Sequence, residues 1–308
     1  MQLIRGLHHL RPQHRPSVVA IGNYDGLHVG HRAILRRVRE VAANAARSTL
    51  VTFEPMPREF FAPESAPPRL ARLSETIELL REQALVEQLL CLRFDAKLAA
   101  MSPQGFVQTV LVEGLAARHV IVGEDFRYGA RRAGDVDSLC SAGARHGFEV
   151  EVAATVCADA ERVSSTRVRE ALLAGELGQA NRMLGRPYLV TGHVQHGKKT
   201  GRTIGFPTAN LRLRRRPALR AGVYAVRMRV HGQVAWQPAV ANFGTRPTVG
   251  GQGQLLEVHC LDGQPDLYGR RLWVELIDFL RPEQRFDGLE ALKSQIKCDV
   301  AAARRCLE

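Results

Sequence analysis

The sequence predicts an α/β fold followed by a β-rich fold. Over residues 1–184, apolar strand-like runs alternate with helical patterns, which favours a parallel sheet. Over residues 185–308, short strand-like runs separated by turn residues are typical of an antiparallel barrel. Between them, Gly185-Arg186-Pro187 is a helix-stop pattern and predicts the domain boundary.

The elements of the first domain follow from its hydrophobic pattern. Strands are expected at 17–22, 49–54, 89–94, 119–123 and 148–156. Helices are expected between them at 30–47, 74–88, 103–116 and 135–146, and one more from Thr166 to near Gly185. Strands that alternate with helices in this order predict a parallel sheet.

The second domain reads as strands at 188–195, 222–232, 233–244, 255–262 and 271–280. Leu289, Leu292 and Ile296 recur at helical spacing in the last stretch. That stretch therefore predicts an amphipathic helix that closes the barrel.

The charge of the chain is uneven. The net charge is +12, and residues 185–308 carry 20 Lys and Arg against 10 Asp and Glu. A basic half suits polyphosphate substrates and equally suits nucleic acid. The densest run, RLRRRPALR at 212–220, contains Pro217 and no aromatic residue for base stacking, which favours a solvated loop. A nucleic-acid-binding protein remains an alternative, and it would bind with an affinity that falls steeply with salt.

Cellular location is inferred from what the sequence lacks. Its first residues contain no apolar run of the length expected for a signal peptide, and no stretch approaches the roughly 20 apolar residues of a membrane span. Its six cysteines form no C-x-x-C pair, so reduced thiols are expected rather than zinc or disulfides. We expect a cytoplasmic protein without a membrane partner; nothing in the sequence specifies an oligomeric state.

The stretch GNYDGLHVGH, residues 22–31, follows the first predicted strand and leads into a helix. Free N–H groups and the dipole at a helix N-terminus attract phosphate, and Gly26 and Gly30 allow close approach of the backbone. His28 and His31 could donate to a phosphate whose charge grows as pyrophosphate departs. A bare H-x-x-H pair can also be two solvent-exposed polar side chains near a turn, and metal binding lacks an evident third ligand.

Two other stretches carry candidate chemistry. Ser164, Ser165 and Thr166 begin a predicted helix beside Arg162 and Arg169, which suits a phosphate cradle or an ordinary helix cap. The motif FEPMP, with Phe53, Pro55 and Pro57, reads alone as a proline-rich strand exit.

The second domain has no P-loop. Glycines could instead form a flexible flap over a nucleotide, or simply a turn-rich hairpin; they are Gly192, Gly197, Gly201 and Gly205. Thr208 and Asn210 are two residues apart, so on a strand their oxygens would share one side and could meet Mg²⁺ and phosphate. Without such partners, Thr208 and Asn210 would simply be polar residues of an edge strand. Glu257 lies among apolar residues of a predicted strand. It is either a carboxylate with a functional role or a glutamate that faces outward from an alternating strand.

These motifs together resemble a known family. H-V-G-H is similar to the HxGH motif of the nucleotidyltransferase superfamily, which binds ATP or CTP and releases pyrophosphate. VTFEPMPREFF, GEDFRYGARRAGD and VSSTRVREAL resemble the first half of the bacterial bifunctional riboflavin kinase/FAD synthetase family. GHVQHGKKTGRTIGFPTANL, GVYAV, NFGTRPTVGG and LEVHCLDGQPDLYGR resemble its kinase half. The likeness covers nearly the whole chain in the right order.

The resemblance implies a Rossmann-like FMN adenylyltransferase domain over 1–184 and a riboflavin kinase domain over 185–308. It implies that riboflavin, FMN and ATP are substrates, with ATP as co-substrate, Mg²⁺ as cofactor and no nucleic-acid partner. His28, His31 and Glu257 would be catalytic, with Glu257 as the general base of the kinase, and Thr208 and Asn210 would hold the metal. The implied nucleotide ligands are Gly22, Asp25, Gly26, Gly30, Arg162, Ser164, Ser165, Thr166, Arg169, Gly192, Gly197, Gly201 and Gly205. The implied flavin contacts are Phe53, Pro55, Pro57, Asp125 and Phe126, where Asp125 would lie near the nucleotide or the flavin phosphate.

The sequence departs from the family pattern at three positions. Tyr24 stands where phenylalanine is usual, Met56 where histidine is common, and Gly263 where an aromatic residue is frequent. None of these removes a proposed catalytic group. A chain in which only one module is active, or in which the first module transfers another nucleotide, remains an alternative.

Overall fold

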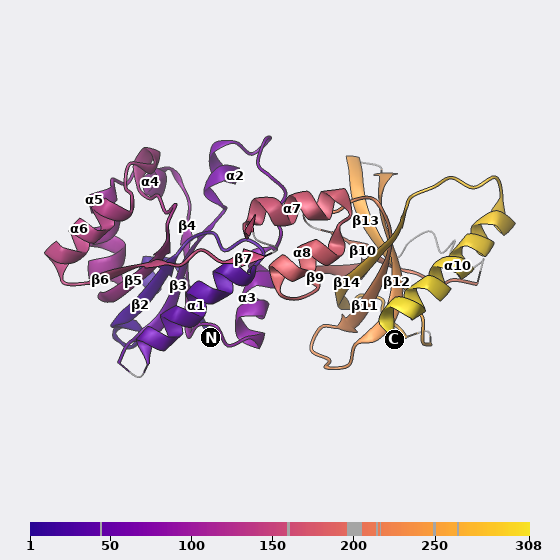
Figure 1. The fold of residues 1–308 in the computed structure, drawn as a ribbon, viewed down its shortest axis with the longest axis horizontal. Helices are drawn as coiled ribbons and strands as arrows, with labels where there is room; N and C mark the ends of the chain where they lie inside the picture. The colour runs from indigo at the N-terminus through magenta and orange to yellow at the C-terminus, as the bar shows by residue number, and fades with distance from the viewer. Residues whose placement is uncertain are drawn as a thin grey trace. The chain divides into compact units, whose positions relative to one another are not determined.

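The computed structural model describes residues 1–43, 45–158, 161–195, 205–213, 215, 217–248, 251–263 and 265–308, with backbone only at 245–248 and 251–253. Its contacts form two compact units, which are coloured along the chain in Figure 1. The first contains Met1–Pro67 and Arg72–Val163, and the second contains Pro68–Ala71 and Ser164–Glu308.

The first unit is built on a six-stranded parallel sheet, as the sequence predicts. Its strand order is β1-β4-β3-β2-β5-β6. The strands are β1 (Gln2–Arg5), β2 (Ser17–Ile21), β3 (Arg47–Glu54), β4 (Gln88–Arg93), β5 (Ala117–Gly123) and β6 (Glu149–Ala153). Strand β1, which pairs with β4, was not predicted, because four residues are too few to show a pattern.

Helices cover both faces of this sheet. The α-helices of this unit are α1 (Val29–Ala42), α2 (Pro57–Phe61), α3 (Leu73–Glu82), α4 (Ala96–Ala99), α5 (Pro103–Phe106) and α6 (Val136–His146), and η3 (Val107–Gly114) is a π-helix. Val19 and Ile21 of β2 join one apolar cluster with residues of α5, η3 and α6. Helix α1 contacts β2, β3 and β5 but adds nothing to that cluster, so it covers the other face. Because both faces of the sheet are buried, its strands are continuous apolar runs without alternating polar residues.

The helix expected at 103–116 is not one α-helix. Ser102 caps α5, and the chain then continues as a π-helix over eight residues. Helices α1 and α3 end earlier than expected, at Ala42 and Glu82, because helix ends carry weak sequence signals.

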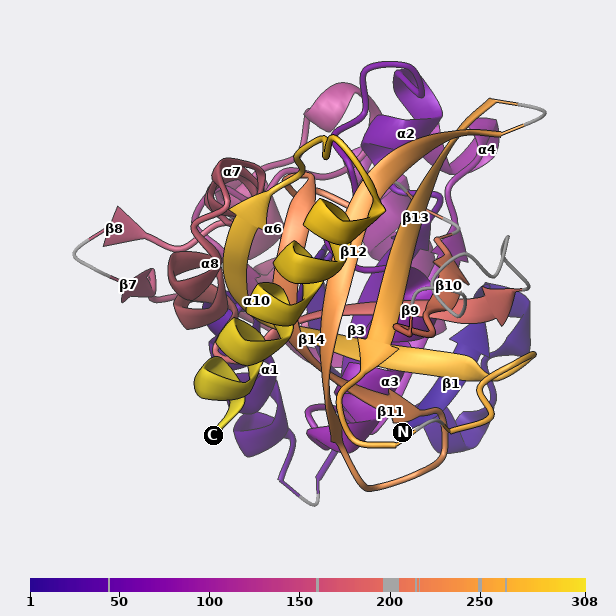
Figure 2. The same cartoon turned by 90° about the vertical axis from the view of Figure 1, so that its right-hand side faces the viewer.

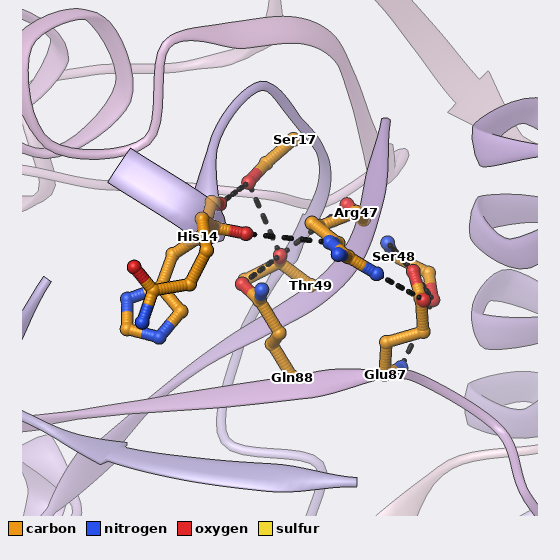
Figure 3. A network of polar contacts seen from close by, with 8 residues as sticks. His14, Ser17, Arg47, Ser48, Thr49, Glu87 and Gln88 are labelled. Atoms are coloured by element: carbon orange, nitrogen blue, oxygen red, sulfur yellow. Dashed lines mark hydrogen bonds and ion pairs between the residues drawn. The ribbon is translucent and has the colours of Figure 1, made fainter. Parts of the chain in front are cut away.

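A polar network joins the N-terminal ends of β2, β3 and β4 (Figure 3); it is buried at Ser17, Thr49 and Gln88 and exposed at Arg47 and Glu87. The Thr49 hydroxyl lies 3.3 Å from both Ser17 Oγ and Gln88 Oε1. Glu87 accepts from the backbone N–H of Ser48 at 3.0 Å and from Arg47 at 2.9 Å. These partners satisfy polar groups that would be costly to bury alone, and they leave the opposite ends of the strands for a ligand.

The second unit is a closed antiparallel barrel with helices, again as predicted. Its strand order is β10-β13-β12-β11-β14-β9 (Figure 2). The strands are β9 (Tyr188–Gln195), β10 (Ala209–Arg212), β11 (Gly222–Val230), β12 (Gln237–Thr248), β13 (Gly251–Cys260) and β14 (Arg271–Pro282). Closure pairs β10 with β9, so that the described strands leave no free edge between them.

Two short helices precede the barrel where one was predicted. Helix α7 (Ser165–Ala174) ends at Gly175, whose φ of 84° is left-handed, and α8 (Leu177–Leu184) follows. Helix α8 contacts β9 and β14, and the Asn181 amide donates to the Leu276 carbonyl at 3.0 Å. These two helices therefore group with the barrel; the boundary after residue 184 stays a prediction about separable modules.

The C-terminal helix α10 (Leu289–Leu307) packs against β11, β12 and β14, as expected for a closing helix. Ala303 lies in an apolar cluster with Val223, Ala225 and Val240 of the barrel. Arg281 adds a bidentate ion pair with buried Asp299, at 2.8 and 2.7 Å.

Across the described ranges, no helix combines the length and apolar character that crossing a membrane requires.

Candidate functional site

Three loops leave the same edge of the first unit's sheet. Strand β2 neighbours β3 on one side and β5 on the other, and the strand order reverses between β2 and β5. The loops after β2, β3 and β5 begin at residues 22, 55 and 124. Open parallel sheets bind ligands at such a reversal, beyond the carboxyl ends of the strands.

His28 and His31 lie in the loop after β2 and the first turn of α1. His28 is the N-cap of the helix, and its Nδ1 accepts the backbone N–H of His31 at 3.2 Å. The two imidazole rings stack with centroids 3.6 Å apart and planes at 16°. Since Nδ1 of His28 accepts, the neutral ring carries its proton on Nε2 and can donate to an anion at the helix N-terminus.

Burial keeps His31 neutral. Loss of solvent, followed by the neighbouring His28, lowers the pKa of His31 well below its usual 6.5. Its Nδ1 is buried and has no hydrogen-bond partner within the described residues. Tyr24 packs against the same ring at 4.6 Å, and burial raises the pKa of its phenol. A neutral imidazole can thus offer a hydrogen bond without an ion's cost of desolvation.

Gly30 makes room for the histidine pair. A Cβ at this position would lie 3.3 Å from both Cε1 and Nδ1 of His28. The glycine between the two histidines is therefore a packing requirement of the site. Gly26 serves the turn before it, with a left-handed φ of 83°.

Gly22 and Asp25, two further predicted nucleotide ligands, lie earlier in this loop. Gly22 donates its backbone N–H to the Val51 carbonyl at 3.1 Å. Asp25 is buried, with 4% of its surface exposed.

The loop after β5 brings two predicted residues together. Arg162 Nη2 lies 3.0 Å from Asp125 Oδ1, and both side chains are largely exposed. Phe126 is half-buried and stacks on Tyr128 with centroids 5.5 Å apart. Asp125 and Arg162 thus form a solvent-facing ion pair that a phosphate can rearrange.

An aromatic cluster lies after β3. Phe53 contacts Phe94 edge-on at 5.9 Å, and Phe94 lies 5.5 Å from Phe60 and 5.7 Å from Phe61. Phe61 is 66% exposed. Pro55 and Pro57 connect β3 to α2, with Pro57 as the first residue of the helix. Exposed aromatic edges of this kind suit a flat aromatic ligand.

The predicted Ser-Ser-Thr cradle begins α7 and belongs to the second unit. Ser164 caps the helix, because its Oγ accepts the N–H of Arg167 at 3.3 Å. Ser165 and Thr166 form the first turn. Arg169 donates from Nε to the Pro68 carbonyl at 2.8 Å, so part of its guanidinium is occupied by backbone.

In the barrel, Glu257 lies in a row of polar side chains. On β13 it is directly opposite Asn210 of β10 and, on its other side, Asn242 of β12. Residues directly opposite share one face of a sheet, and all three are half-buried while their strand neighbours are buried. Thr208 directly precedes β10 and is also half-buried. The row gathers a carboxylate and two amides on one face of the barrel wall.

The prediction that Gly192 belongs to a flexible flap is wrong. This residue lies within β9, where a Cβ would come within 3.1 Å of Leu211 and 3.2 Å of the Arg212 carbonyl, so it serves close strand packing. Gly205 has a left-handed φ of 88° in a turn before β10. Gly197 and Gly201 lie outside the described residues.

The oxygen donors fit Mg²⁺ better than a softer metal. The Thr208 hydroxyl, the Asn210 amide and the Glu257 carboxylate are hard ligands. Over the described part of the chain, no three His, Cys, Asp or Glu side chains gather as a metal site. Few protein ligands are expected for Mg²⁺, which is typically shared with substrate phosphates.

Models of two protein families match the chain. The FAD synthetase model matches residues 10–167, and the riboflavin kinase model matches residues 184–307. A Pseudomonas fluorescens protein named bifunctional riboflavin kinase/FMN adenylyltransferase is 52% identical over 99% of this chain and 97% of its own length. The chain belongs to the bifunctional riboflavin kinase/FMN adenylyltransferase family.

Another protein of the same name is similar to this chain, and a solved structure shares its fold. The Escherichia coli K12 protein of the same name is 47% identical over 99% of this chain and 97% of its own length. A crystal structure described as a macrolide-efflux protein from Streptococcus pneumoniae superposes with a TM-score of 0.85, at 28% identity, over 99% of both chains. The word efflux describes the Streptococcus pneumoniae protein and is not applied to this chain.

The structure also adds residues that sequence reasoning missed. Asn242 beside Glu257 comes from the motif NFG, and its role depends on strand register. Phe94 and Phe60 join Phe53 only through tertiary contacts. Of the three departures from the family pattern, Gly263 has a left-handed φ of 81°, which favours glycine, and Tyr24 packs against the His31 ring. The Met56 side chain has no structural explanation, since only its backbone N–H donates to Glu59.

Proposed function

We propose that this chain phosphorylates riboflavin with ATP to give FMN, and then transfers AMP from a second ATP to FMN to give FAD and pyrophosphate. The observation that carries the proposal is that this chain contains two candidate sites, one in each unit, and belongs to a family named for both activities. One site is the stacked histidine pair at the strand reversal of the first unit. The other is the row of Asn210, Glu257 and Asn242 on the barrel.

In the adenylyl transfer, a phosphate oxygen of FMN attacks the α-phosphorus of ATP, and the bond to pyrophosphate breaks. His28, as helix N-cap, donates from Nε2 to the ATP phosphates together with the N–H groups of α1. Neutral His31 adds a second donor as charge develops on the leaving pyrophosphate. The loop from Gly22 to Gly30 would hold the nucleotide, and no covalent enzyme intermediate is required.

FMN is expected to bind next to this nucleotide. Its aromatic ring would contact the wall of Phe53, Pro55 and Pro57, with Phe60, Phe61 and Phe94 extending it. Arg162, which already pairs with Asp125, would turn to the flavin phosphate. The α7 residues Ser164, Ser165, Thr166 and Arg169 remain proposed phosphate ligands.

In the kinase reaction, the 5′-hydroxyl of riboflavin attacks the γ-phosphorus of ATP, and ADP leaves. Glu257 accepts the hydroxyl proton, as a half-buried carboxylate between two amides can. Thr208 and Asn210 would hold Mg²⁺, which supplies charge neutralisation at the phosphates when bound. Glycines 197, 201 and 205 remain proposed nucleotide contacts.

The wider setting follows from the chemistry. Both reactions consume ATP, so we place the protein in the cytoplasm, with small molecules rather than nucleic acid as its ligands. The basic second half then serves polyphosphate substrates. We propose residues 1–184 and 185–308 as the two functional modules.

The test is a time course with purified protein, riboflavin, ATP and Mg²⁺, with flavins separated by chromatography. The wild type is expected to form FMN first and FAD second. His31→Ala should stop at FMN, and Glu257→Gln should form FAD only from supplied FMN. His146→Ala and Glu290→Gln change the same residue types at exposed positions and should behave as wild type. A wild type that forms neither flavin nucleotide would refute the proposal.

A further inference from the structure

A histidine of β13 contacts the segment that leads into β10. His259 Nδ1 lies 2.8 Å from the carbonyl oxygen of Pro207. The rings of His259 and Phe206 meet edge-on, with centroids 5.6 Å apart and planes at 77°. Because a carbonyl oxygen can only accept, His259 donates its Nδ1–H. All three residues are half-buried and belong to the second unit, so the contact lies within one compact body.

Pro207 is joined directly to Thr208, one of the proposed metal ligands. Strand β10 begins one residue later, at Ala209, so Thr208 and the residues before it lie outside the strand. Pro207 has no backbone N–H, and its carbonyl is therefore the one main-chain group through which a hydrogen bond can hold it. The bond from His259 uses that group. Thr208 is thus held by β10 on one side and through Pro207 on the other.

The same histidine lies two residues beyond Glu257, the proposed general base. Residues i and i+2 of a strand share one face, so His259 and Glu257 lie on the same face of β13. The register pairs Asn210 with Glu257. In an antiparallel pair, two residues back on one strand correspond to two residues forward on the other, which brings Thr208 level with His259. The imidazole therefore links the segment that contains Thr208 to the strand that contains Glu257.

The His259 side chain makes two contacts that can be separated by substitution. Its ring packs against Phe206, and its N–H satisfies the Pro207 carbonyl. A half-buried carbonyl that loses its donor regains a partner by turning toward water. Such a turn at Pro207 would displace Thr208, because the two residues share a peptide bond. The hydrogen bond, more than the ring contact, is therefore expected to fix the position of Thr208.

We propose that His259 is a positioning residue for riboflavin phosphorylation: through its hydrogen bond to Pro207, it holds Thr208 next to Asn210 and Glu257. This rests on the proposed function, in which Thr208 and Asn210 hold Mg²⁺. A ligand that is already in place binds with less loss of conformational entropy than a mobile one. Loss of the hydrogen bond should therefore raise the Mg²⁺ concentration that the kinase reaction requires, and saturating Mg²⁺ should restore the rate.

The experiment uses the full chain and separates the two contacts of His259. His259→Phe keeps a ring beside Phe206 and removes the donor. His259→Asn does the reverse, because the amide nitrogen of asparagine is bonded to Cγ, as Nδ1 of histidine is, while the ring is lost. His193→Ala is the matched control, since His193 is an exposed histidine on β9 of the same barrel.

The first readout is amide hydrogen exchange over residues 206–211, measured without nucleotide or metal. His259→Phe should speed exchange in this segment about fivefold, the effect of one hydrogen bond on local opening. His259→Asn and His193→Ala should exchange as wild type does. Unchanged exchange in His259→Phe would overturn the proposal, because the hydrogen bond would then not hold the segment.

The second readout is FMN formation from riboflavin as a function of Mg²⁺ concentration. His259→Phe should raise the half-maximal Mg²⁺ concentration about fivefold, with kcat at saturating Mg²⁺ within about twofold and FAD formation from supplied FMN unchanged. His259→Asn and His193→Ala should stay within about twofold of wild type. A wild-type Mg²⁺ dependence in His259→Phe, or a lowered kcat that saturating Mg²⁺ does not restore, would contradict the positioning role.

A double variant covers the case in which the substitution disturbs the barrel in general. If His259 acts through Thr208, then His259→Phe should cause no further rise in the Mg²⁺ requirement of Thr208→Ala. Two rises that multiply would show independent effects and would also overturn the proposal. A wild type that forms no FMN from riboflavin would refute the proposed function and this role with it, whereas an active wild type with an unchanged His259→Phe would refute only the role of His259.

Discussion

Replacement of Gly30 by alanine should separate stability from activity. The new Cβ would lie 3.3 Å from Cε1 and Nδ1 of His28, closer than carbon atoms pack comfortably. The His28 ring has little room to yield, since it already stacks on His31 at 3.6 Å. The His31 N–H to His28 Nδ1 hydrogen bond, already long at 3.2 Å, would be lost or distorted. Meanwhile, glycine to alanine in a helix stabilises by up to about 1 kcal/mol.

A displacement of catalytic groups by a few tenths of an ångström to 1 Å costs about ten- to a hundredfold in rate. That range corresponds to about 1.4 to 2.7 kcal/mol in the barrier. We therefore expect Gly30→Ala to lower kcat/KM for FAD formation by that factor, with riboflavin phosphorylation unchanged and a melting temperature equal to or above that of wild type.

Gly178→Ala is the matched control. Gly178 is also helical, in α8, and its nearest atom to a new Cβ is Arg182 Nη1 at 3.7 Å, an ordinary contact. This variant should keep both activities. Both variants are assayed in parallel for FAD from FMN and for FMN from riboflavin. Full FAD synthesis by Gly30→Ala would refute the reasoning, and a lowered melting temperature would show that the lost rate reflects unfolding instead.

Three further predictions concern pH, the C-terminal helix and the metal. Burial, with Arg11, Arg47 and Arg15 nearby, lowers the pKa of His14 from 6.5. The unfolded chain then binds protons that the folded chain does not, so stability should fall as pH drops below about 6.5; melting curves from pH 7.5 to 5.5 should show a smaller fall for His14→Phe. Asp299→Ala leaves half-buried Arg281 without its carboxylate and should cost about 1.5–3 kcal/mol in urea unfolding, followed by Trp236 and Trp273 fluorescence. Glu290→Ala breaks only the exposed pair with Lys293 and should cost less than about 1 kcal/mol. Asn210→Ala should raise the Mg²⁺ concentration for half-maximal FMN formation and leave FAD formation from FMN unchanged; an identical Mg²⁺ dependence would remove Asn210 from the metal site.

The histidine pair was predictable because its features are local. A buried strand, two glycines and a helix start lie within 15 residues of one another, and such neighbours in sequence remain neighbours in the fold. The serine cap at Ser164 was predictable for the same reason, since a cap bonds within three residues. The break at Gly175 was missed because one glycine within a helical pattern can be tolerated or can end the helix.

From the amino-acid sequence alone, the fold class, the order of the strands along the chain, the histidine pair and the candidate residues Asn210 and Glu257 could be stated. They follow from hydrophobic periodicity and short motifs, which act over a few residues. Tertiary structure alone decided that Asn210 and Asn242 flank Glu257, that Phe94 contacts Phe53, and that Arg215 donates to the Arg69 and Leu70 carbonyls. These contacts join residues 15 to 146 positions apart. Their geometry depends on strand register and on packing, which no local pattern encodes.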